Sequence, residues 1–213
     1  MILDLLRHGE TEQGGLRGSL DDALTDKGWA QMREAVAEAG PWEVLVSSPL
    51  QRCARFAEEL GERLNLPVQR EAALQELHFG DWEGRSATQI MEDQADALGR
   101  FWADPYAFTP PNGEPVEAFA ERVLAAVERL GRQHAGKRVL LVTHGGVMRL
   151  LLARARGLPR AQLLQVEVGH AALMRLVPGD DGQWVEGRSW PSFGLRLFLA
   201  GNAIPVDPGF GVT

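Results

Sequence analysis

The sequence predicts an α/β fold, because short β-rich segments alternate with amphipathic helical segments along the chain. The strand expected at residues 138–143 is the clearest of them, since its run Val139-Leu140-Leu141-Val142 is typical of a strand buried on both faces. The chain has 213 residues, 45% hydrophobic and 24% charged, as in ordinary globular proteins. Because no repeat, low-complexity tract or linker divides it, we expect a single domain over residues 1–213.

The first half of the chain supplies two strands and two helices. Residues 2–6 and 44–46 are short apolar runs that indicate strands. Thr25 has the side chain of a helix N-cap, and a helix is expected from about residue 26 to 39. A second helix is expected over residues 49–64, because it opens with proline and its apolar residues follow at helical spacing.

The second half begins with residues 74–115, a segment without a clear period that contains several aromatic side chains. We expect it to be an insertion that packs over one end of the sheet. Helices are expected over residues 115–130 and 147–156, where apolar residues recur at helical spacing. Two further strands are expected at residues 165–168 and 171–177.

Charge and composition exclude several classes of protein. The chain carries 29 acidic and 22 basic side chains, a net charge of −7, which disfavours nonspecific binding to nucleic acids. No apolar run reaches the roughly 18 residues of a membrane helix, and the first residues lack a signal peptide's basic start, so we expect a cytoplasmic protein. The single cysteine, Cys53, excludes an intramolecular disulfide and a cysteine-built zinc site. The tail after Gly201 is rich in glycine and proline, and we expect it to be loosely ordered.

Two histidines lie at the ends of two predicted strands, and each is followed by glycine. His8, preceded by Arg7, ends the first strand, and His144 ends the most convincing buried strand. Ligands bind at the carboxyl edge of open α/β sheets, so neighbouring parallel strands would bring both imidazoles together there. Arg52 belongs to the same edge, because it lies in the first turn of the helix that follows another strand.

These side chains suit a tetrahedral dianion. Two arginines, two imidazoles and a helix N-terminus bind such a group strongly. Positive charge nearby lowers the pKa of a histidine, and a neutral imidazole is a nucleophile that can form a covalent intermediate. A metal site built from His8, His144 and Glu10 is the alternative, but the arginines would repel a cation.

Four segments of the chain, in this order, resemble the four signatures of the histidine phosphatase superfamily. They are Leu6-Arg7-His8-Gly9-Glu10-Thr11, Ser47-Ser48-Pro49-Leu50-Gln51-Arg52, Glu76-Leu77-His78-Phe79-Gly80-Asp81-Trp82-Glu83-Gly84 and Thr143-His144-Gly145-Gly146. Members of this family include cofactor-dependent phosphoglycerate mutases, fructose-2,6-bisphosphatases and α-ribazole phosphatases. The resemblance implies a three-layer α/β/α sandwich with a mostly parallel mixed sheet, like that of phosphoglycerate mutase, in which residues 74–115 form part of the active-site cover.

The resemblance also implies a role for each matching residue. His8 is implied to be the nucleophile that becomes phosphorylated. Arg7, Arg52 and His144 are implied to bind and stabilise the phosphoryl group. Glu76 is implied to protonate the leaving oxygen and later to activate water. The family needs no metal, so no metal or other cofactor is expected.

The chain departs from the family pattern after the first signature. Many relatives have Trp-Asn there, and the asparagine helps to bind phosphate, whereas this chain has Gln13-Gly14. Arg17, which stands where relatives often have glutamine, would restore a phosphate donor or contact another part of the substrate, so it joins the phosphate-binding candidates. Glu83 is the competing candidate for the acid, and His170 is a further residue that could reach the site.

The spacing of the signatures favours a phosphatase over a mutase, because only 23 residues separate Arg52 from Glu76 and mutases of the family usually carry a longer insertion. The compact form and the ending Trp82-Glu83-Gly84 resemble the α-ribazole phosphatases of cobalamin synthesis, so we expect α-ribazole 5′-phosphate as the substrate. A broad-specificity phosphatase, a phosphoglycerate mutase and a noncatalytic phosphate-binding module are the alternatives.

The aromatic side chains of the insertion fit the same hypothesis. They would either stack on a benzimidazole or pack the insertion against the sheet, and they are Trp82, Trp102, Tyr106 and Phe108. The expected partner is therefore a small phosphorylated substrate, with no nucleic acid and no membrane, and both a monomer and a homodimer stay open.

Overall fold

A six-stranded sheet forms the centre of the computed structural model, which describes residues 1–188; residues 189–213, including the tail after Gly201, lie outside the described part. The strands are β1 (Ile2–Arg7), β2 (Val44–Ser47), β3 (Val68–Arg70), β4 (Arg138–Thr143), β5 (Leu173–Pro178) and β6 (Trp184–Glu186). They lie in the order β3-β2-β4-β1-β5-β6. The four strands from β3 to β1 are parallel, and β5 and β6 are antiparallel to their neighbours, so the predicted mostly parallel mixed sheet is confirmed.

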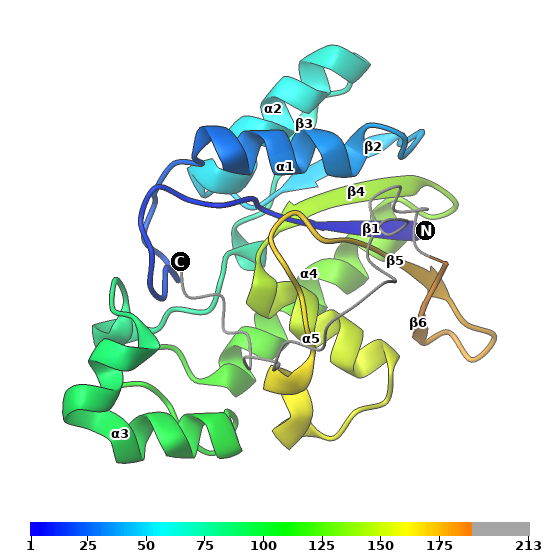
Figure 1. Ribbon diagram of the computed structural model, residues 1–213. Helices are drawn as coiled ribbons and strands as arrows, with labels where there is room; N and C mark the ends of the chain where they lie inside the picture. Colours follow the sequence, from blue (N-terminus) through cyan, green and yellow to red (C-terminus); the bar gives the residue numbers. More distant parts are fainter. Residues whose placement is uncertain (189–213) are drawn as a thin grey trace, which may run out of the picture.

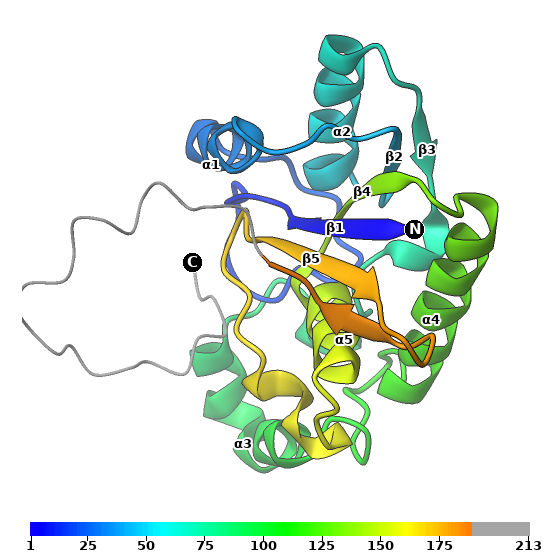
Figure 2. The same ribbon diagram turned by 90° about the vertical axis from the view of Figure 1, so that its right-hand side faces the viewer.

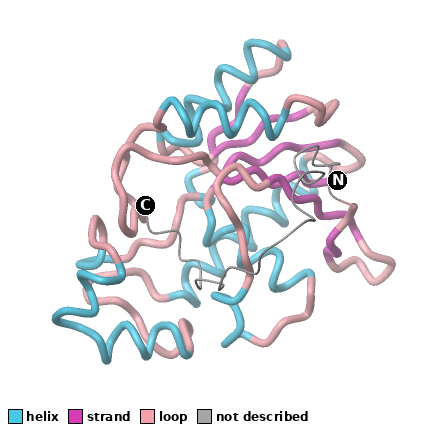
Figure 3. The backbone as a smooth tube through the Cα atoms, in the orientation of Figure 1, coloured by secondary structure: helices cyan, strands magenta, loops and turns pink. Residues whose placement is uncertain are grey.

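Helices cover both faces of this sheet (Figures 1 and 2). α1 (Asp26–Val36) and α2 (Gln51–Leu64) lie on one face, and α4 (Val116–Gln133) and α5 (Gly145–Ala155) lie on the other. Figure 3 shows the strands as a layer between the two sets of helices, which is the predicted three-layer sandwich. None of the helices within residues 1–188 is long and apolar enough to span a membrane.

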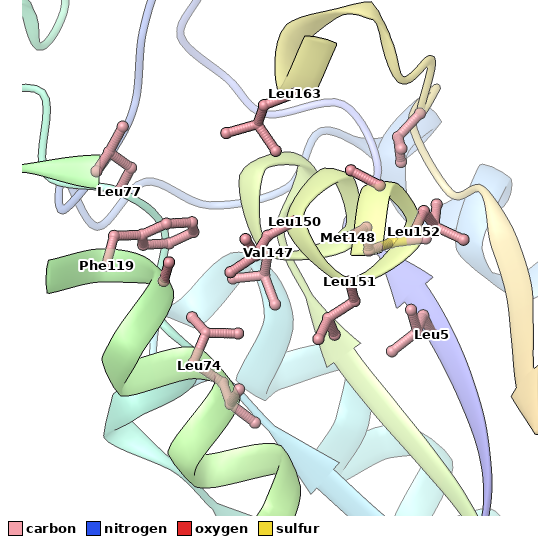
Figure 4. Close-up of a cluster of buried hydrophobic side chains, with 14 of the residues drawn as sticks. Leu5, Leu74, Leu77, Phe119, Val147, Met148, Leu150, Leu151, Leu152 and Leu163 are labelled. Carbon is pink, nitrogen blue, oxygen red and sulfur yellow. The ribbon is translucent and has the colours of Figure 1, made fainter. Parts of the chain in front are cut away.

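The central strands alternate their side chains between two apolar clusters. Leu3 and Leu5 of β1 pack in the cluster beneath α4 and α5, whereas Leu6 packs in the cluster beneath α1 and α2. Figure 4 shows Leu5 and the α5 residues Met148 and Leu151 in the larger of these clusters. Because β1 and β4 are buried on both faces, their carboxyl ends are held in a fixed place at the edge of the sheet.

One predicted strand is wrong. Residues 160–165 form a short 3₁₀ helix, and residues 166–168 form neither helix nor strand within the described chain. Val166 and Val168 are nevertheless buried, and their carbonyl groups accept hydrogen bonds from Arg149 and Arg7 instead of from a neighbouring strand. The apolar pattern therefore predicted correctly that these residues are buried, but arginine side chains, instead of a neighbouring strand, form the hydrogen bonds of their backbone carbonyl groups.

The segment 74–115 contains a helix that the sequence pattern did not predict. α3 (Ala87–Ala103) begins after Ser86, whose side chain and that of Gln89 form a capping box. The short 3₁₀ helices Ala72–Leu74 and Gly80–Trp82 precede it. Ser-x-x-Gln is a sequence signal for a helix start, so this helix could have been found from its cap instead of its periodicity.

A buried carboxylate on β1 ties the sheet to the chain around it. Asp4 has no exposed surface, and it accepts two hydrogen bonds from Arg175 of β5, at 2.7 and 3.0 Å. The indole Nε1 of Trp42 donates a third hydrogen bond to Asp4, at 2.7 Å. The charge of Asp4 is therefore paired and fully hydrogen-bonded, as a buried carboxylate must be to be tolerated.

Replacing Asp4 by alanine should lower the free energy of unfolding by about 3 kcal/mol, because it removes one partner of a buried, hydrogen-bonded ion pair. Urea-induced equilibrium unfolding measures the change. The matched control is Glu59→Ala, which breaks the exposed ion pair with Arg33 and should change stability little. Equal losses in the two variants would contradict the importance of the buried pair.

Candidate active site

The parallel pairing of β1 with β4 brings the two sequence-predicted histidines together. Arg7 is in register with Thr143, and the backbone N–H of His8 donates to the carbonyl of Thr143 at 3.0 Å. His144 is the N-cap residue of α5. The two imidazole rings lie 5.4 Å apart between centroids, in an edge-to-face arrangement, and both are buried.

The hydrogen bonds of His8 fix its tautomer. Its Nδ1 lies 2.8 Å from the carbonyl oxygen of Gly9, which can only accept, so Nδ1 carries the proton and Nε2 keeps a lone pair. Burial, and then the charges of Arg52 and Arg7, hold the pKa of His8 well below its ordinary value of 6.5. The ring is therefore neutral near pH 7 and has an unprotonated nitrogen.

His144 lies in a more enclosed environment than His8. Its Nε2 is 2.7 Å from the hydroxyl of Ser48, which follows β2, and the thiol of Cys53 lies 3.7 Å from the same nitrogen. Burial and the charge of Arg52 also lower the pKa of His144 well below 6.5. Burial raises the pKa of Cys53 to about 12, so its thiol stays protonated and behaves as part of the core.

Backbone carbonyl groups hold both arginines in place beside the histidines. Arg52 donates to the carbonyls of Leu20 and Gly18, at 2.5 and 2.7 Å, and Arg7 donates to that of Val168 at 2.6 Å. The Nε atoms of Arg7 and Arg52 are buried and have no hydrogen-bond partner among residues 1–188. Both arginines line one pocket with His8, so their positive charge favours an anion there.

Glu76 reaches the same pocket from the loop before α3. Its carboxylate accepts hydrogen bonds from the backbone N–H of Gly146 at 2.9 Å and from that of Leu77 at 3.0 Å. Gly146 belongs to the first turn of α5, where backbone N–H groups lack helical partners and favour a negative charge. A Cβ atom on Gly146 would come within 2.2 Å of the Glu76 carboxylate, so only glycine allows this approach.

Arg17 lines the pocket, but a carboxylate holds it there. Its Nε donates to Asp22 at 3.0 Å, and its NH1 donates to the carbonyl of Gly14 at 3.3 Å. Arg17 therefore lies at the pocket beside the position of the missing asparagine. Glu83, the competing candidate for the acid, instead accepts hydrogen bonds from Ser19 and from the N–H of Phe79, and so joins two loops.

His170, which the sequence suggested could reach the site, lines the pocket, and the structure adds Arg149 to the predicted set. The ring of His170 lies 5.9 Å from that of His8, and its pKa is lowered to about 4 by burial and by Arg7. Arg149 also lines the pocket. A signal for Arg149 was present, because it lies one helical turn after Gly145 and so shares its face of α5.

The side of the pocket away from the histidines is apolar. It is formed largely by the segment 74–115 and by α4, through Phe79, Trp82, Ile90, Leu98, Phe101, Trp102, Pro105, Val116 and Phe119. Of the four aromatic residues expected to form a wall, Trp82 and Trp102 line this pocket, whereas the Phe108 ring stacks on Trp82 and Tyr106 lies under Arg160. The pocket therefore has a cationic end and an apolar end.

The alternative metal site does not assemble. Glu10 forms an ion pair with Lys27 at 2.7 Å and a hydrogen bond with Thr25 at 3.2 Å, so its carboxylate does not join His8 and His144. Within the described residues, no group of three histidine, cysteine or acidic side chains is placed to hold a metal ion.

Because these histidines are neutral in the folded protein, its free energy of unfolding should depend on pH. In the unfolded chain a histidine has a pKa of about 6.5, whereas His8, His144 and His170 have lowered values in the folded protein. Below about pH 6.5 the unfolded state therefore binds more protons, so the free energy of unfolding should fall as the pH falls, by up to about 1.4 kcal/mol per pH unit for each fully buried histidine. Urea unfolding of the parent and of His144→Gln between pH 7 and 5 checks this. The variant should show the shallower slope, and equal slopes would contradict the lowered pKa.

The comparisons with known proteins agree with this geometry. Residues 3–190 match the histidine phosphatase superfamily (branch 1). The adenosylcobalamin/alpha-ribazole phosphatase of Escherichia coli (strain K12) is 34% identical over 212 residues, which cover 97% of this chain and 99% of that protein. The glucosyl-3-phosphoglycerate phosphatase of Mycobacterium tuberculosis (strain ATCC 25618 / H37Rv) is 32% identical over 211 residues, which cover 92% of each protein. The crystal structure of the alpha-ribazole phosphatase from Shigella flexneri has a TM-score of 0.77 and 28% identity, and the match covers 88% of this chain and 95% of that one.

An α/β sandwich whose strand ends gather two neutral imidazoles and buried guanidinium donors is an arrangement suited to phosphate esters. With a family match that spans most of its length, the chain belongs to the histidine phosphatase superfamily (branch 1) and is a phosphatase. The resemblance drawn from the four signatures is thus confirmed.

Proposed function

We propose that this phosphatase hydrolyses phosphomonoesters in two steps through a phosphohistidine at His8, and that its substrate is α-ribazole 5′-phosphate. The observation that carries the mechanism is the neutral ring of His8, whose Nδ1 is bonded to Gly9 so that Nε2 keeps its lone pair. His8 lines a pocket together with Arg7 and Arg52, whose positive charges attract a phosphate dianion.

In the first step, Nε2 of His8 attacks the phosphorus, and the bond to the ester oxygen breaks as the N–P bond forms. N–H donors of Arg7 and Arg52 hold the phosphoryl oxygens and stabilise their charge as it shifts. His144 does not line the pocket, and its Nε2 lies 2.7 Å from the Ser48 hydroxyl, so it is proposed to join these donors by turning that nitrogen from Ser48 to the phosphate. In this scheme Glu76 takes up a proton as the phosphate dianion binds beside it, gives that proton to the leaving oxygen, and the alcohol departs.

In the second step, a water molecule attacks the phosphohistidine, and the carboxylate of Glu76 takes its proton. The N–P bond breaks, its electron pair returns to Nε2 of His8, and inorganic phosphate leaves. Glu76 is again protonated and His8 again neutral. The guanidinium and imidazole donors supply the positive charge that this scheme requires, so we propose that it runs without a metal.

The proposed substrate rests on the apolar end of the pocket and on the relatives. A phosphate at the histidines would direct its leaving group towards Trp102, Phe101 and their apolar neighbours, which suit a benzimidazole nucleoside. Arg17 is proposed to bind the phosphate or a neighbouring polar group of the substrate. We propose that residues 74–115 act as the cover of the site, which the many pocket-lining residues from this segment support.

A substrate panel with a metal chelator present tests this proposal. We expect kcat/KM for α-ribazole 5′-phosphate to exceed that for p-nitrophenyl phosphate by about 100-fold, a ratio that specific pocket contacts can supply. Equal values would overturn the substrate and favour a broad-specificity phosphatase. Loss of activity with the chelator would overturn the metal-free scheme. Interconversion of phosphoglycerates in the presence of a bisphosphate primer would indicate a mutase. Binding of phosphate without turnover of any substrate would indicate a noncatalytic phosphate-binding module.

A further inference from the structure

An arginine outside the predicted site holds the backbone of the loop that carries Glu76. Arg122 lies on α4, and its NH1 donates to the carbonyl groups of Ala73 at 2.7 Å and Gln75 at 3.0 Å. Its NH2 donates to the carbonyl of Glu76 itself at 3.0 Å. One guanidinium group therefore binds three carbonyl groups within four residues of chain.

Glu114 completes this arrangement from the other side. Its carboxylate accepts from Nε and NH2 of Arg122, at 2.7 and 2.9 Å, in a two-point ion pair. The same carboxylate accepts from the backbone N–H of His78 at 3.3 Å, and the backbone N–H of Glu114 donates to the carbonyl of His78 at 2.8 Å. Arg122 and Glu114 thus hold the chain on both sides of Leu77, and we call this pair the Arg122–Glu114 bracket.

The bracket uses the full bonding capacity of Arg122. A guanidinium group has five N–H donors, and all five are accounted for by three carbonyl groups and two carboxylate oxygens. The guanidinium also lies over the ring of Phe119, at 4.9 Å from its centroid. Lysine, with three donors on one nitrogen, could not reproduce this set. A simple ion pair between Arg122 and Glu114 would need only the two hydrogen bonds to the carboxylate.

Other hydrogen bonds hold the two ends of the loop, where the N–H of Gln75 donates to the Ala72 carbonyl and the N–H of Phe79 donates to Glu83. Residues 75–79, all within the described part of the chain, form neither helix nor strand. Leu77 anchors the loop to the apolar cluster beside Phe119, as Figure 4 shows, but apolar packing does not by itself set the direction of the neighbouring carboxylate. The carboxylate of Glu76 must meet the N–H of Gly146, which belongs to a different element. The hydrogen bonds from the bracket to the backbone fix the position of Glu76, from which its side chain reaches Gly146.

We propose that the Arg122–Glu114 bracket positions Glu76 for proton transfer to the leaving group. This rests on the proposed role of Glu76 as the acid. Arg122 is then a positioning residue that acts through Glu76 and does not touch the substrate. Outer contacts of this kind typically change activity by about 10- to 100-fold when they are removed.

The test compares two esters that differ in their need for a proton. Benzyl phosphate releases a strongly basic alkoxide unless it is protonated, whereas p-nitrophenyl phosphate releases a stable phenolate. Because kcat/KM reports the steps up to departure of the leaving group, loss of the acid should lower it much more for the benzyl ester. The ratio of the two values does not depend on the fraction of folded enzyme, so a purely structural defect leaves it unchanged.

Glu76→Gln serves as the reference, and Arg122→Met as the variant. We expect Arg122→Met to lower kcat/KM for benzyl phosphate by about 10- to 100-fold and that for p-nitrophenyl phosphate by about threefold or less. In the Glu76→Gln background the same change should leave the ratio unaltered. The matched control is Arg129→Met on the same helix, which removes an exposed ion pair with Glu71 and should leave the ratio as in the parent.

The outcomes distinguish failure of the positioning role of Arg122 from failure of the proposed role of Glu76 as the acid. If Glu76→Gln changes the ratio and Arg122→Met lowers both esters equally, the bracket only stabilises the fold and the positioning role is overturned. If Glu76→Gln leaves the ratio unchanged, Glu76 is not the acid, so the proposed mechanism fails and the positioning role with it. If Arg122→Met does not fold, Arg122→Lys replaces it. A ratio of the two kcat/KM values that lies between those of the parent and of Glu76→Gln then supports the proposal. A ratio equal to that of the parent overturns it.

Discussion

Replacing His8 by alanine should lower kcat for p-nitrophenyl phosphate by about 10⁴-fold or more, the loss typical when a covalent nucleophile is removed. The expected loss is this large because the neighbouring ring cannot take over. Nε2 of His144 lies 2.7 Å from the Ser48 hydroxyl, deep in the core, and its Cys53 neighbour is held as a neutral thiol. Steady-state kinetics measures kcat, and trapping with radiolabelled substrate measures the phosphoenzyme, which should be absent from the variant.

The control for this experiment is His134→Ala. His134 lies at the end of α4, where its ring contacts Gln69 at 3.3 Å, remote from the strand ends that carry His8. This variant should retain the parent's kcat and its phosphoenzyme. Turnover by His8→Ala at more than about one-tenth of the parent's rate would contradict a covalent role for His8, since it would match loss of a binding contact only.

The positions of His8 and His144 were predictable because both residues lie at strand ends. His8 and His144 are far apart in the sequence, yet each directly follows a short, largely apolar run that indicates a buried strand. Parallel pairing of such strands fixes where the next residue lies, so the sequence pattern and the topology together place the two rings.

The parts of the structure that were not predicted from the sequence depend on hydrogen bonds between side chains and backbone carbonyl groups. The residues Val166 and Val168 have the alternation of a strand, but Arg149 and Arg7 satisfy their carbonyl groups, and no periodicity reports this. The same is true of Arg122, whose partners lie in a loop almost fifty residues earlier in the chain. A sequence shows which groups are apolar, whereas it does not show which donor will reach an irregular segment.

Replacing Gly146 by alanine should lower kcat/KM for benzyl phosphate by about 100-fold, the cost typical of moving a catalytic group by about 1 Å. The added methyl carbon would lie 2.2 Å from Oε1 of Glu76, well inside contact distance, so the carboxylate must leave its hydrogen bond with the N–H of Gly146. The backbone itself has no need of glycine there, because Gly146 lies within α5, where alanine is the better helix former. The lost activity should therefore come without a loss of helix.

The matched control is Gly131→Ala in α4, where an added methyl carbon would meet only the end of the Met1 side chain, at 3.9 Å. This control should gain a little stability and keep full activity, because alanine replaces glycine inside a helix. If Gly146→Ala also kept full activity, the carboxylate of Glu76 would not need the α5 N-terminus, and its proposed position in proton transfer would be wrong. A loss of activity on benzyl phosphate that exceeds the loss on p-nitrophenyl phosphate would instead show that the small residue after Gly145 is required because it leaves room for an acid beside the leaving group.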